Sequence, residues 1–329
     1  MRIRPVLQLT LRLAILAAAM LAAHPAPAQP YPAKPIRVIL PVPAGGVADV
    51  VMRATGQELT KRLGQPVILE YRPGASGIIA SEACAKAVPD GYTLCVLYPD
   101  MTSFNPLFYQ KLPYNADTDF EPIIHLIDLT TGITVPASLP LKSVAELRAL
   151  AKAKPGYLNF GSVGNGSEPH QFLEWLKQLW GVDIVHVAYK GAAPIGQALL
   201  AGDIQLTRVG LGTFLGQIRS GKLKVLAVSG KERSPLLPDV PTFTEVGLDG
   251  YGIQPWFGLA GPAATPKSIV TKLNAEIVQI FGDSKFREQH VISQGNIPVA
   301  GTPEEFAAFL RNDRERAAQV LKITKVRPD

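Results

Sequence analysis

Two glycine-rich loops hold the residues whose types and spacing could do chemistry. The first is Pro43-Ala44-Gly45-Gly46, which follows the apolar run Ile36–Leu40 and precedes a helical pattern with Asp49 in its first turn. The second, Gly-Ser-Val-Gly-Asn-Gly-Ser at 161–167, has the same setting. A helix start presents unpaired N–H groups and the positive end of the helix dipole. Either loop could therefore hold an anion.

Neither loop matches a motif for nucleotide binding or hydrolysis. The chain has no G-x-x-x-x-G-K-[ST] and no G-x-S-x-G, and Gly164-Asn165-Gly166 is an isolated G-x-G. Ser162, Ser167, His170 and His186 could supply a nucleophile and a base. However, His170 falls early in a helical pattern and His186 lies inside an apolar strand, which favours structural roles. Backbone N–H groups with Ser and Asn side chains recognise a carboxylate without reacting with it, so we expect binding and no enzyme activity.

The charge balance excludes a nucleic-acid partner. The net charge of +6 includes three arginines in the first 28 residues, which carry no acid, so the rest of the chain has about +3. The remaining Lys and Arg residues are scattered, without the basic stripe that nucleic acid requires. Two Cys and five His show no metal-ligand spacing, so we expect neither a metal nor a cofactor.

The first 28 residues have the pattern of a secretory signal peptide. Arg2, Arg4 and Arg12 form a basic region, Leu13–Ala23 is apolar, and Ala26-Pro27-Ala28 is an A-x-A cleavage site. We therefore expect export to the periplasm and a mature chain that begins at residue 29. The alternative is an uncleaved membrane anchor, but the apolar run is too short to span a bilayer.

Cys84 and Cys95 leave two interpretations open. An exported pair of cysteines can form a disulfide. Yet Cys84 lies in a helical pattern and Cys95 in an apolar strand, so both could equally be small buried hydrophobic residues.

Strands and helices alternate along the chain after the signal, which predicts parallel or mixed sheets covered by helices. Expected strands lie at 36–40, 67–70, 94–98, 123–127, 131–135, 158–160, 184–187, 204–206, 224–228 and 253–260; expected helices end at 63, 87, 154, 180, 201, 281 and about 321. We expect capping boxes at Ser143 and Thr302, and a cap by Thr265-Pro266. Each glycine-rich loop follows the carboxyl end of a strand, where open α/β sheets bind ligands, so the two loops could meet across a cleft.

Motifs spread over nearly all of the chain after the signal resemble one receptor family. In chain order they are Tyr31-Pro32, Pro43-Ala44-Gly45-Gly46 with Asp49, Leu63-Gly64-Gln65-Pro66-Val67, Arg72-Pro73-Gly74-Ala75, Pro89-Asp90-Gly91-Tyr92-Thr93-Leu94, Asn105-Pro106, Lys111-Leu112-Pro113-Tyr114, Gly161-Ser162 with Gly164-Asn165-Gly166-Ser167, Val182-Asp183-Ile184-Val185-His186-Val187, Tyr189-Lys190-Gly191, Ser234-Pro235, Leu237-Pro238-Asp239-Val240-Pro241-Thr242, Trp256-Phe257-Gly258-Leu259 and Thr302-Pro303-Glu304-Glu305-Phe306. Together they resemble the Bug-type extracytoplasmic substrate-binding receptors of tripartite tricarboxylate transporters.

The resemblance implies an α/β protein with the type II periplasmic-binding-protein fold, in which two α/β domains close on a ligand cleft about two hinge crossings. Domain 1 would comprise 29–130 and 253–329, domain 2 would comprise 131–252, and the crossings would lie near 128–132 and 250–256. The implied function is capture of a small carboxylate for a membrane permease of the tripartite tricarboxylate type. The alternative is a sensor of the same fold that feeds a signalling partner. We expect a monomer.

The resemblance also implies which residues touch the ligand. One carboxylate would lie against the first loop, held by backbone groups and bridging waters, with Asp49 capping the helix nearby. The second domain would contribute the loop at 162–167. The expected ligand-binding residues are Pro43, Ala44, Gly45, Gly46, Ala48, Asp49, Ser76, Asp100, Met101, Ser162, Gly164, Asn165, Gly166, Ser167, Glu168, Arg208 and Val209.

Several positions depart from the family pattern. Val42 replaces an aromatic residue, Ala48 replaces a threonine, and Val209 replaces an aspartate that family members often carry, which argues against a ligand amino group. Arg208 could pair with a second carboxylate in bidentate fashion, or it could be structural. Asp100 and Glu168 would repel an anion if both lined the pocket, and the sequence leaves this open.

Overall fold

Two separate β-sheets organise the part of the chain that the structure describes. The computed structural model describes residues 30–326, of which those from Lys34 onward form one unit. The described residues 30–33 contain no helix or strand. The predicted signal peptide lies outside the described residues. None of the described helices is long and apolar enough to cross a membrane.

The first sheet has six strands in the order β11-β4-β10-β3-β1-β2. β1, β2 and β3 are parallel, whereas β10 is antiparallel to β3 and β4. We call this sheet and its helices lobe 1. Its elements are β1 (Ile36–Leu40), α2 (Val47–Leu63), β2 (Val67–Tyr71), α3 (Ile78–Ala85), β3 (Thr93–Leu97), α4 (Asn105–Phe108), β4 (Phe120–Leu129), β10 (Trp256–Pro262), α9 (Lys267–Gly282), α10 (Ser284–His290), β11 (Asn296–Pro298) and α11 (Pro303–Thr324).

The second sheet has five strands in the order β7-β6-β8-β5-β9. We call this sheet and its helices lobe 2. Its elements are β5 (Thr131–Pro136), α5 (Val144–Ala153), β6 (Asn159–Ser162), α6 (Glu168–Trp180), β7 (Val185–Ala188), α7 (Ala192–Ala201), β8 (Leu206–Gly210), α8 (Leu215–Arg219) and β9 (Leu223–Val228).

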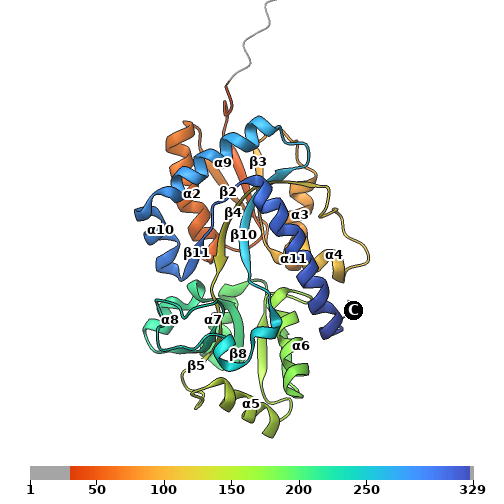
Figure 1. The fold of residues 1–329 in the computed structure, drawn as a ribbon, viewed down its shortest axis with the longest axis vertical. Coiled ribbons are helices and arrows are strands. Elements are labelled where there is room, and N and C mark those ends of the chain that lie inside the picture. Colours follow the sequence, from red (N-terminus) through yellow and green to blue (C-terminus); the bar gives the residue numbers. More distant parts are fainter. Residues whose placement is uncertain (1–29, 327–329) are drawn as a thin grey trace, which may run out of the picture. The chain divides into compact units, whose positions relative to one another are not determined.

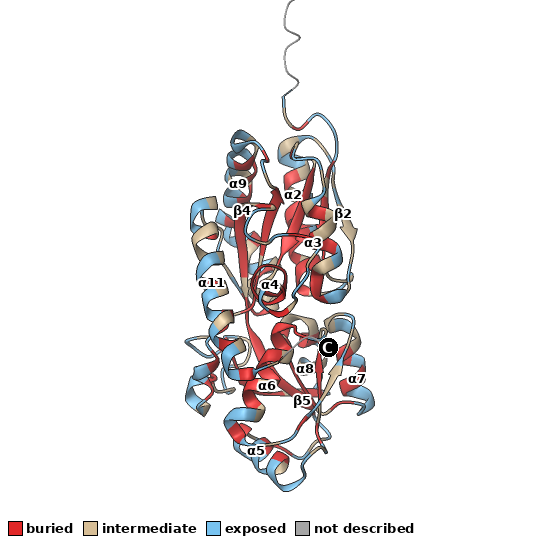
Figure 2. Cartoon of the chain, turned by 90° about the vertical axis from the view of Figure 1, so that its right-hand side faces the viewer, coloured by how far each residue is buried: buried red, intermediate tan, exposed pale blue. Residues whose placement is uncertain are grey.

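Burial explains why the apolar runs became strands. All five residues of β3 are buried, as expected for a central strand that helices cover on both faces. Figure 2 shows the buried residues concentrated on the strands and on the inner faces of the helices around them, whereas the outer sides of α5 and α9 are exposed. Both lobes therefore hold apolar cores of their own.

The lobes are joined at two neighbouring crossings. β4 passes into β5 through Thr130, and the chain returns between β9 and β10. The crossings are bonded to each other, because the Leu129 N–H donates to the Pro255 carbonyl at 2.8 Å. Figure 1 shows β4 and β10 running together toward this junction.

The terminal helix α11 makes a third connection between the lobes, which was not predicted from the sequence. Its early residue Phe306 packs in the lobe 1 core, and its later residues Ala317 and Val320 pack in the lobe 2 core. The Thr324 hydroxyl also donates to the side-chain oxygen of Gln171 in α6 at 2.6 Å. The domain division drawn from the sequence remains a prediction, and this helix spans its boundary.

The alternation of strands and helices is confirmed, with ends that differ by a few residues from the expected ones. The capping box at Thr302 is present in full. At Ser143 only half of the box forms: the Ser143 hydroxyl accepts from the Glu146 N–H, but the Glu146 carboxylate accepts from the Lys142 N–H and not from that of Ser143. The cap by Thr265 is wrong, because its hydroxyl donates to the Pro262 carbonyl instead. The short elements α4, α8, α10 and β11 were not predicted.

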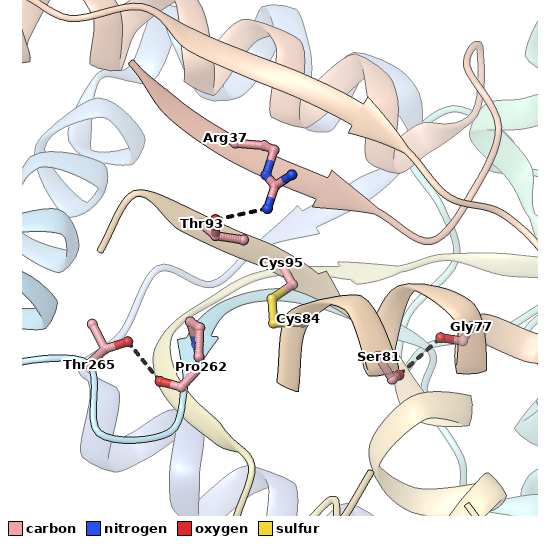
Figure 3. The surroundings of a disulfide bond; sticks show 8 residues. All are labelled: Arg37, Gly77, Ser81, Cys84, Thr93, Cys95, Pro262 and Thr265. Atoms are coloured by element: carbon pink, nitrogen blue, oxygen red, sulfur yellow. Dashed lines mark hydrogen bonds between the residues drawn. A yellow bond between two sulfur atoms is a disulfide. The ribbon is translucent and has the colours of Figure 1, made fainter. Parts of the chain in front are cut away.

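The two cysteines form a disulfide, which decides the question that the sequence left open. Cys84 in α3 is joined to Cys95 in β3, both side chains are fully buried, and their Cα atoms are 6.1 Å apart. Figure 3 shows the bond beneath β1, where it fastens α3 to the sheet. α3 begins directly after the cavity-lining loop at 73–77.

Candidate ligand site

A cavity of about 440 Å³ lies between the lobes, a volume in the range of small-molecule sites. Lobe 1 contributes the loop before α2, the loop at 73–77 and the residues Tyr98, Pro99 and Asp100. Lobe 2 contributes the loops before α6 and α7 and the end of β8. Leu129, Thr131 and Pro255 at the crossings also line it. The cavity therefore stands where the carboxyl ends of parallel strands in both lobes face each other.

The first glycine-rich loop brings a helix start to the cavity. Pro43, Gly46, Val47 and Ala48 line it, and Gly46 is the N-cap of α2. The N–H groups in the first turn of any helix have no intrahelical acceptor, and here no side chain of the described residues caps them. They are available to an anion in the cavity.

Asp49 does not cap α2, contrary to the expectation from the sequence. It stands in the first turn, where its Oδ2 accepts from the Gly45 N–H at 2.8 Å. Its Oδ1 accepts from Arg53 at 2.8 Å and from the Tyr71 hydroxyl at 2.6 Å. The Asp49 carboxylate is thus fully engaged by protein groups, and its bond to Gly45 holds the loop to the helix. Neither Asp49 nor Gly45 lines the cavity.

The loop at 74–77 carries backbone strain at the cavity wall. Ala75 and Ser76 both have φ of +46°, and Gly74 and Gly77 flank them with φ of +123° and +83°. Left-handed backbone at two successive non-glycine residues costs of order 1–3 kcal/mol each and is found where ligands are held. The Asn105 side chain fixes the loop by donating to the Ser76 carbonyl at 2.8 Å.

The second glycine-rich loop is bonded mainly to itself. The Ser167 hydroxyl donates to the Gly164 carbonyl at 2.6 Å, and the Gly164 N–H donates to the Ser162 hydroxyl at 3.2 Å. The Gly166 N–H donates to His170 Nδ1 at 3.0 Å. Of this loop Val163, Gly164 and Asn165 line the cavity, whereas Ser162, Gly166 and Ser167 stand behind it.

Two stacked histidines support that loop. The ring centroids of His170 and His186 lie 3.7 Å apart with the rings stacked nearly parallel, and His186 Nε2 is 2.5 Å from the Ser162 hydroxyl. Burial lowers the pKa of both histidines to about 4, and the mutual proximity of the rings adds to this for His186. Both are neutral at neutral pH. Neither histidine lines the cavity, which fits the structural roles that the sequence favoured.

The second loop touches lobe 1 directly. The Ser76 hydroxyl donates to the Asn165 carbonyl at 3.4 Å, and the Tyr109 hydroxyl lies 3.5 Å from the same oxygen. Gly166 is held at a φ of +73°, with the Phe108 ring where a β-carbon would be. The lobes are therefore in contact across the cavity.

Arg208 is committed to a protein carboxylate. It forms a buried ion pair with Glu168, and its second terminal nitrogen donates to the Ile253 carbonyl at 3.1 Å. Its guanidinium carbon lies 4.6 Å from the Phe172 ring and 5.1 Å from the Tyr251 ring. Only 1% of Arg208 and 4% of Glu168 is exposed. Burial raises the pKa of Glu168, and Arg208 beside it limits the rise.

Asp100 joins this cluster from lobe 1. It is fully buried, its Oδ1 accepts from the Glu168 N–H at 2.8 Å, and its Oδ2 has no partner among the described residues. Burial raises the pKa of Asp100 well above its ordinary value, and the Glu168 and Asp313 carboxyls add to the rise. Asp100 and Glu168, the two acids whose place the sequence left open, therefore both line the cavity. Glu168 is paired with Arg208, and Asp100 accepts from the Glu168 N–H.

The structure gathers most of the residues proposed from the sequence, and their ligand contacts remain predictions. Ten of the seventeen line the cavity: Pro43, Gly46, Ala48, Ser76, Asp100, Gly164, Asn165, Glu168, Arg208 and Val209. Ala44, Gly45, Asp49, Met101, Ser162, Gly166 and Ser167 do not. Six further lining residues were not predicted from the sequence: Tyr98, Tyr109, Tyr189, Lys190, Trp256 and Phe257. Four of these lie in family motifs, Tyr189-Lys190 and Trp256-Phe257, so their motif membership was the signal that could have found them.

Two α/β lobes around a cavity at a pair of crossings define a two-lobed solute-binding protein. The family model described as tripartite tricarboxylate transporter family receptor matches residues 51–325. The chain belongs to this family. It is similar to Protein BugT of Bordetella pertussis, with 34% identity over 88% of this chain and 89% of that protein.

Solved structures agree in fold. An R. palustris protein solved with adipate is 31% identical, with a TM-score of 0.87 over 91% of this chain and 100% of that chain. MatC from Rhodopseudomonas palustris with bound malate is also 31% identical, with a TM-score of 0.82 over 88% of this chain and 100% of that chain. The expected binding-protein fold is therefore confirmed. Within residues 30–326, no three His, Cys, Asp or Glu side chains come together as a metal site.

Proposed function

We propose that this receptor captures a small carboxylate in the cavity between its lobes and delivers it, in the periplasm, to a membrane permease of the tripartite tricarboxylate type. The observation that carries the proposal is the uncapped start of α2. Val47 and Ala48 of its first turn line the cavity, and no side chain among residues 30–326 caps this helix start. An anion there would accept bonds that the protein leaves open.

Two further observations support a carboxylate. Lys190 lines the cavity from lobe 2 and adds a positive charge. Related proteins that share the fold over nearly their whole length have been solved with adipate and malate, both carboxylates. The proposal assigns no catalytic step, because the Ser162 and His186 pair lies behind the loop and outside the lining.

The expected delivery step is closure about the two crossings. A ligand that contacts both lobes stabilises the closed arrangement and presents one composite surface to a permease. We expect the receptor to act as a monomer. A sensor of the same fold would share the binding step and differ only in its partner, so co-purification with membrane proteins from ligand-grown cells separates these roles.

A thermal-shift screen of residues 29–329 tests the proposal. The panel comprises mono-, di- and tricarboxylates, amino acids and uncharged amides at equal concentration. A ligand that binds only the folded state raises the melting temperature by mass action. We expect shifts with one class of carboxylate. Absence of any shift, in a sample shown by mass spectrometry to carry no ligand, would contradict the proposal.

Gly46→Val gives a matched test of the place of binding. Gly46 has an ordinary φ of −86°, and an added β-carbon would come no closer than 3.9 Å to the Pro43 carbonyl. The variant should therefore keep its melting temperature within a few degrees and lose the ligand shift. Gly282→Val is the control, because that position is exposed, has open space for a β-carbon and lies at the end of α9 away from the cavity.

A further inference from the structure

Four charged residues line the cavity within the described chain: Asp100, Glu168, Lys190 and Arg208. Their charges set what kind of acid the site can hold. Arg208 and Glu168 neutralise each other in a buried ion pair, and the remaining contacts of Arg208 are a backbone carbonyl and aromatic rings. Arg208 is only 1% exposed, so its positive charge is already used by the protein.

A ligand carboxylate on this buried side would meet an unfavourable environment. It would lie beside Glu168, whose charge repels it, and both terminal nitrogens of Arg208 are already bonded, one to Glu168 and one to the Ile253 carbonyl. Removing one partner from a buried pair leaves an uncompensated charge, which is strongly destabilising. Asp100, fully buried beside Glu168, offers no positive charge either.

Lys190, unlike Arg208, is neither buried nor paired with a protein carboxylate. It is exposed, and its side chain has no ion pair or hydrogen bond with the described residues. The next residue, Gly191, lies against the Pro43 ring, where a β-carbon would come within 2.9 Å. Lys190 is therefore next to the first glycine-rich loop, and it immediately precedes the start of α7, whose residues Ala192 and Ala193 also line the cavity.

The rest of the lining is largely apolar or aromatic. It includes Tyr98, Leu129, Val209, Trp256 and Phe257. Trp256 is fully buried, so this wall is a fixed part of the lobe 1 core. Such a wall accommodates hydrocarbon or an aromatic ring and offers no compensation for a second charge.

We propose that the site reads a single carboxylate, held between the first glycine-rich loop and Lys190, and selects ligands whose remaining body is uncharged. This inference rests on the proposed function and narrows it. It separates this receptor from relatives solved with adipate and malate, each of which carries two carboxylates. The Glu168–Arg208 pair then sets specificity, because Glu168 neutralises the arginine charge that a second ligand carboxylate would need.

Calorimetric titration with acids matched in carbon skeleton tests the inference. The pairs are hexanoate with adipate, and benzoate with terephthalate, each measured on residues 29–329 at pH 7.5. We expect the monocarboxylate of the preferred skeleton to bind at least about tenfold more tightly than its dicarboxylate partner. A dicarboxylate that binds as tightly or more tightly would overturn the inference while leaving the proposed function intact. Failure of every carboxylate across the wider screen would overturn both.

One variant and its control test whether Lys190 holds the ligand carboxylate. Lys190→Gln should weaken monocarboxylate binding about tenfold, in the range for loss of a hydrogen bond to a charged group. Lys222→Gln is the control, because Lys222 is also exposed in lobe 2 and does not line the cavity. Equal affinities for the two variants would remove Lys190 from the account.

Glu168→Gln tests whether the ion pair sets specificity. It frees the charge of Arg208 without removing side-chain volume, so the ratio of dicarboxylate to monocarboxylate affinity should rise at least about tenfold if the pair excludes the second charge. The melting temperature is measured in parallel, and the ratio is taken from folded protein only. An unchanged ratio in a folded variant would show that the ion pair does not set this preference.

Discussion

The Oδ1 atom of Asp100 in lobe 1 lies 2.8 Å from the backbone nitrogen of Glu168, the first residue of α6 in lobe 2. A side chain of one lobe thus caps a helix of the other. The same helix residue pairs with Arg208, and the Tyr251 hydroxyl donates to its carbonyl at 2.9 Å. Glu168 is therefore the point at which the lobe contact, the buried ion pair and the cavity wall meet.

Asp100→Ala should loosen the contact between the lobes. The change removes the acceptor for the first N–H of α6, and loss of a helix cap costs about 1 kcal/mol. We expect small-angle scattering of ligand-free protein to show a larger radius of gyration than for wild type. Asp100→Asn is the control, because its amide oxygen can still accept from Glu168. An alanine variant with the wild-type radius would contradict this role for Asp100.

Arg208→Ala should act first on stability. It leaves the Glu168 carboxylate buried without its cation, which typically costs about 3–5 kcal/mol. Urea unfolding followed by tryptophan fluorescence should therefore show a clearly lower midpoint. Arg208→Ala combined with Glu168→Gln should recover part of the loss, because the buried charge is gone. A single variant as stable as wild type would mean that the pair is not structural.

Stability should fall on acidification because of the stacked histidines. The folded-state pKa of His170 and His186, about 4, lies below the ordinary value of 6.5. Between these values the unfolded chain binds more protons than the folded chain. The contribution of the pair is therefore complete above pH 6.5 and is lost as the pH falls toward 4.

His186→Phe isolates this effect. Phenylalanine can keep the stack on His170 but cannot take up a proton. The melting temperature of the variant should drop less than that of wild type between pH 7 and pH 5. Buried Asp100, Glu168 and Asp313, whose pKa values are raised, titrate in both proteins and cancel from the comparison. Equal drops would show that the histidines do not govern acid sensitivity.

The disulfide should contribute substantially to the stability of lobe 1. Cys84 and Cys95 are 11 residues apart, and closing a loop of this length stabilises by about 2–3 kcal/mol in the chain-entropy account. Cys84→Ala combined with Cys95→Ala should lower the melting temperature by several degrees. Ligand affinity should change little, because neither cysteine lines the cavity. A double variant as stable as wild type would contradict the assignment.

Local sequence patterns predicted the strands and helices well, because apolar runs and capping residues determine them over short distances. The start of α2 shows the limit of such reasoning. Asp49 has the spacing of a helix-start residue, but its oxygens are taken by Gly45, Arg53 and Tyr71. Tyr71 lies on the neighbouring strand β2, a contact that chain spacing does not reveal.

The chemistry of the cavity was less predictable for the same reason. Arg208 stood out as an unusual cation, and its partner Glu168 is 40 residues away on another element. Only the fold shows that the two cancel. Lys190 drew no attention as a charge, since an exposed lysine in a loop is ordinary, and it gains meaning only from the contact between Gly191 and Pro43.

The most direct test of carboxylate capture compares one preferred acid with its own primary amide by calorimetric titration. The amide has nearly the same shape and lacks the charge. If the start of α2 and Lys190 hold a carboxylate, the acid should bind at least about tenfold more tightly than the amide, and Gly46→Val should abolish the difference. Equal binding of acid and amide to wild-type protein would contradict the account, because the cavity would then be reading shape alone.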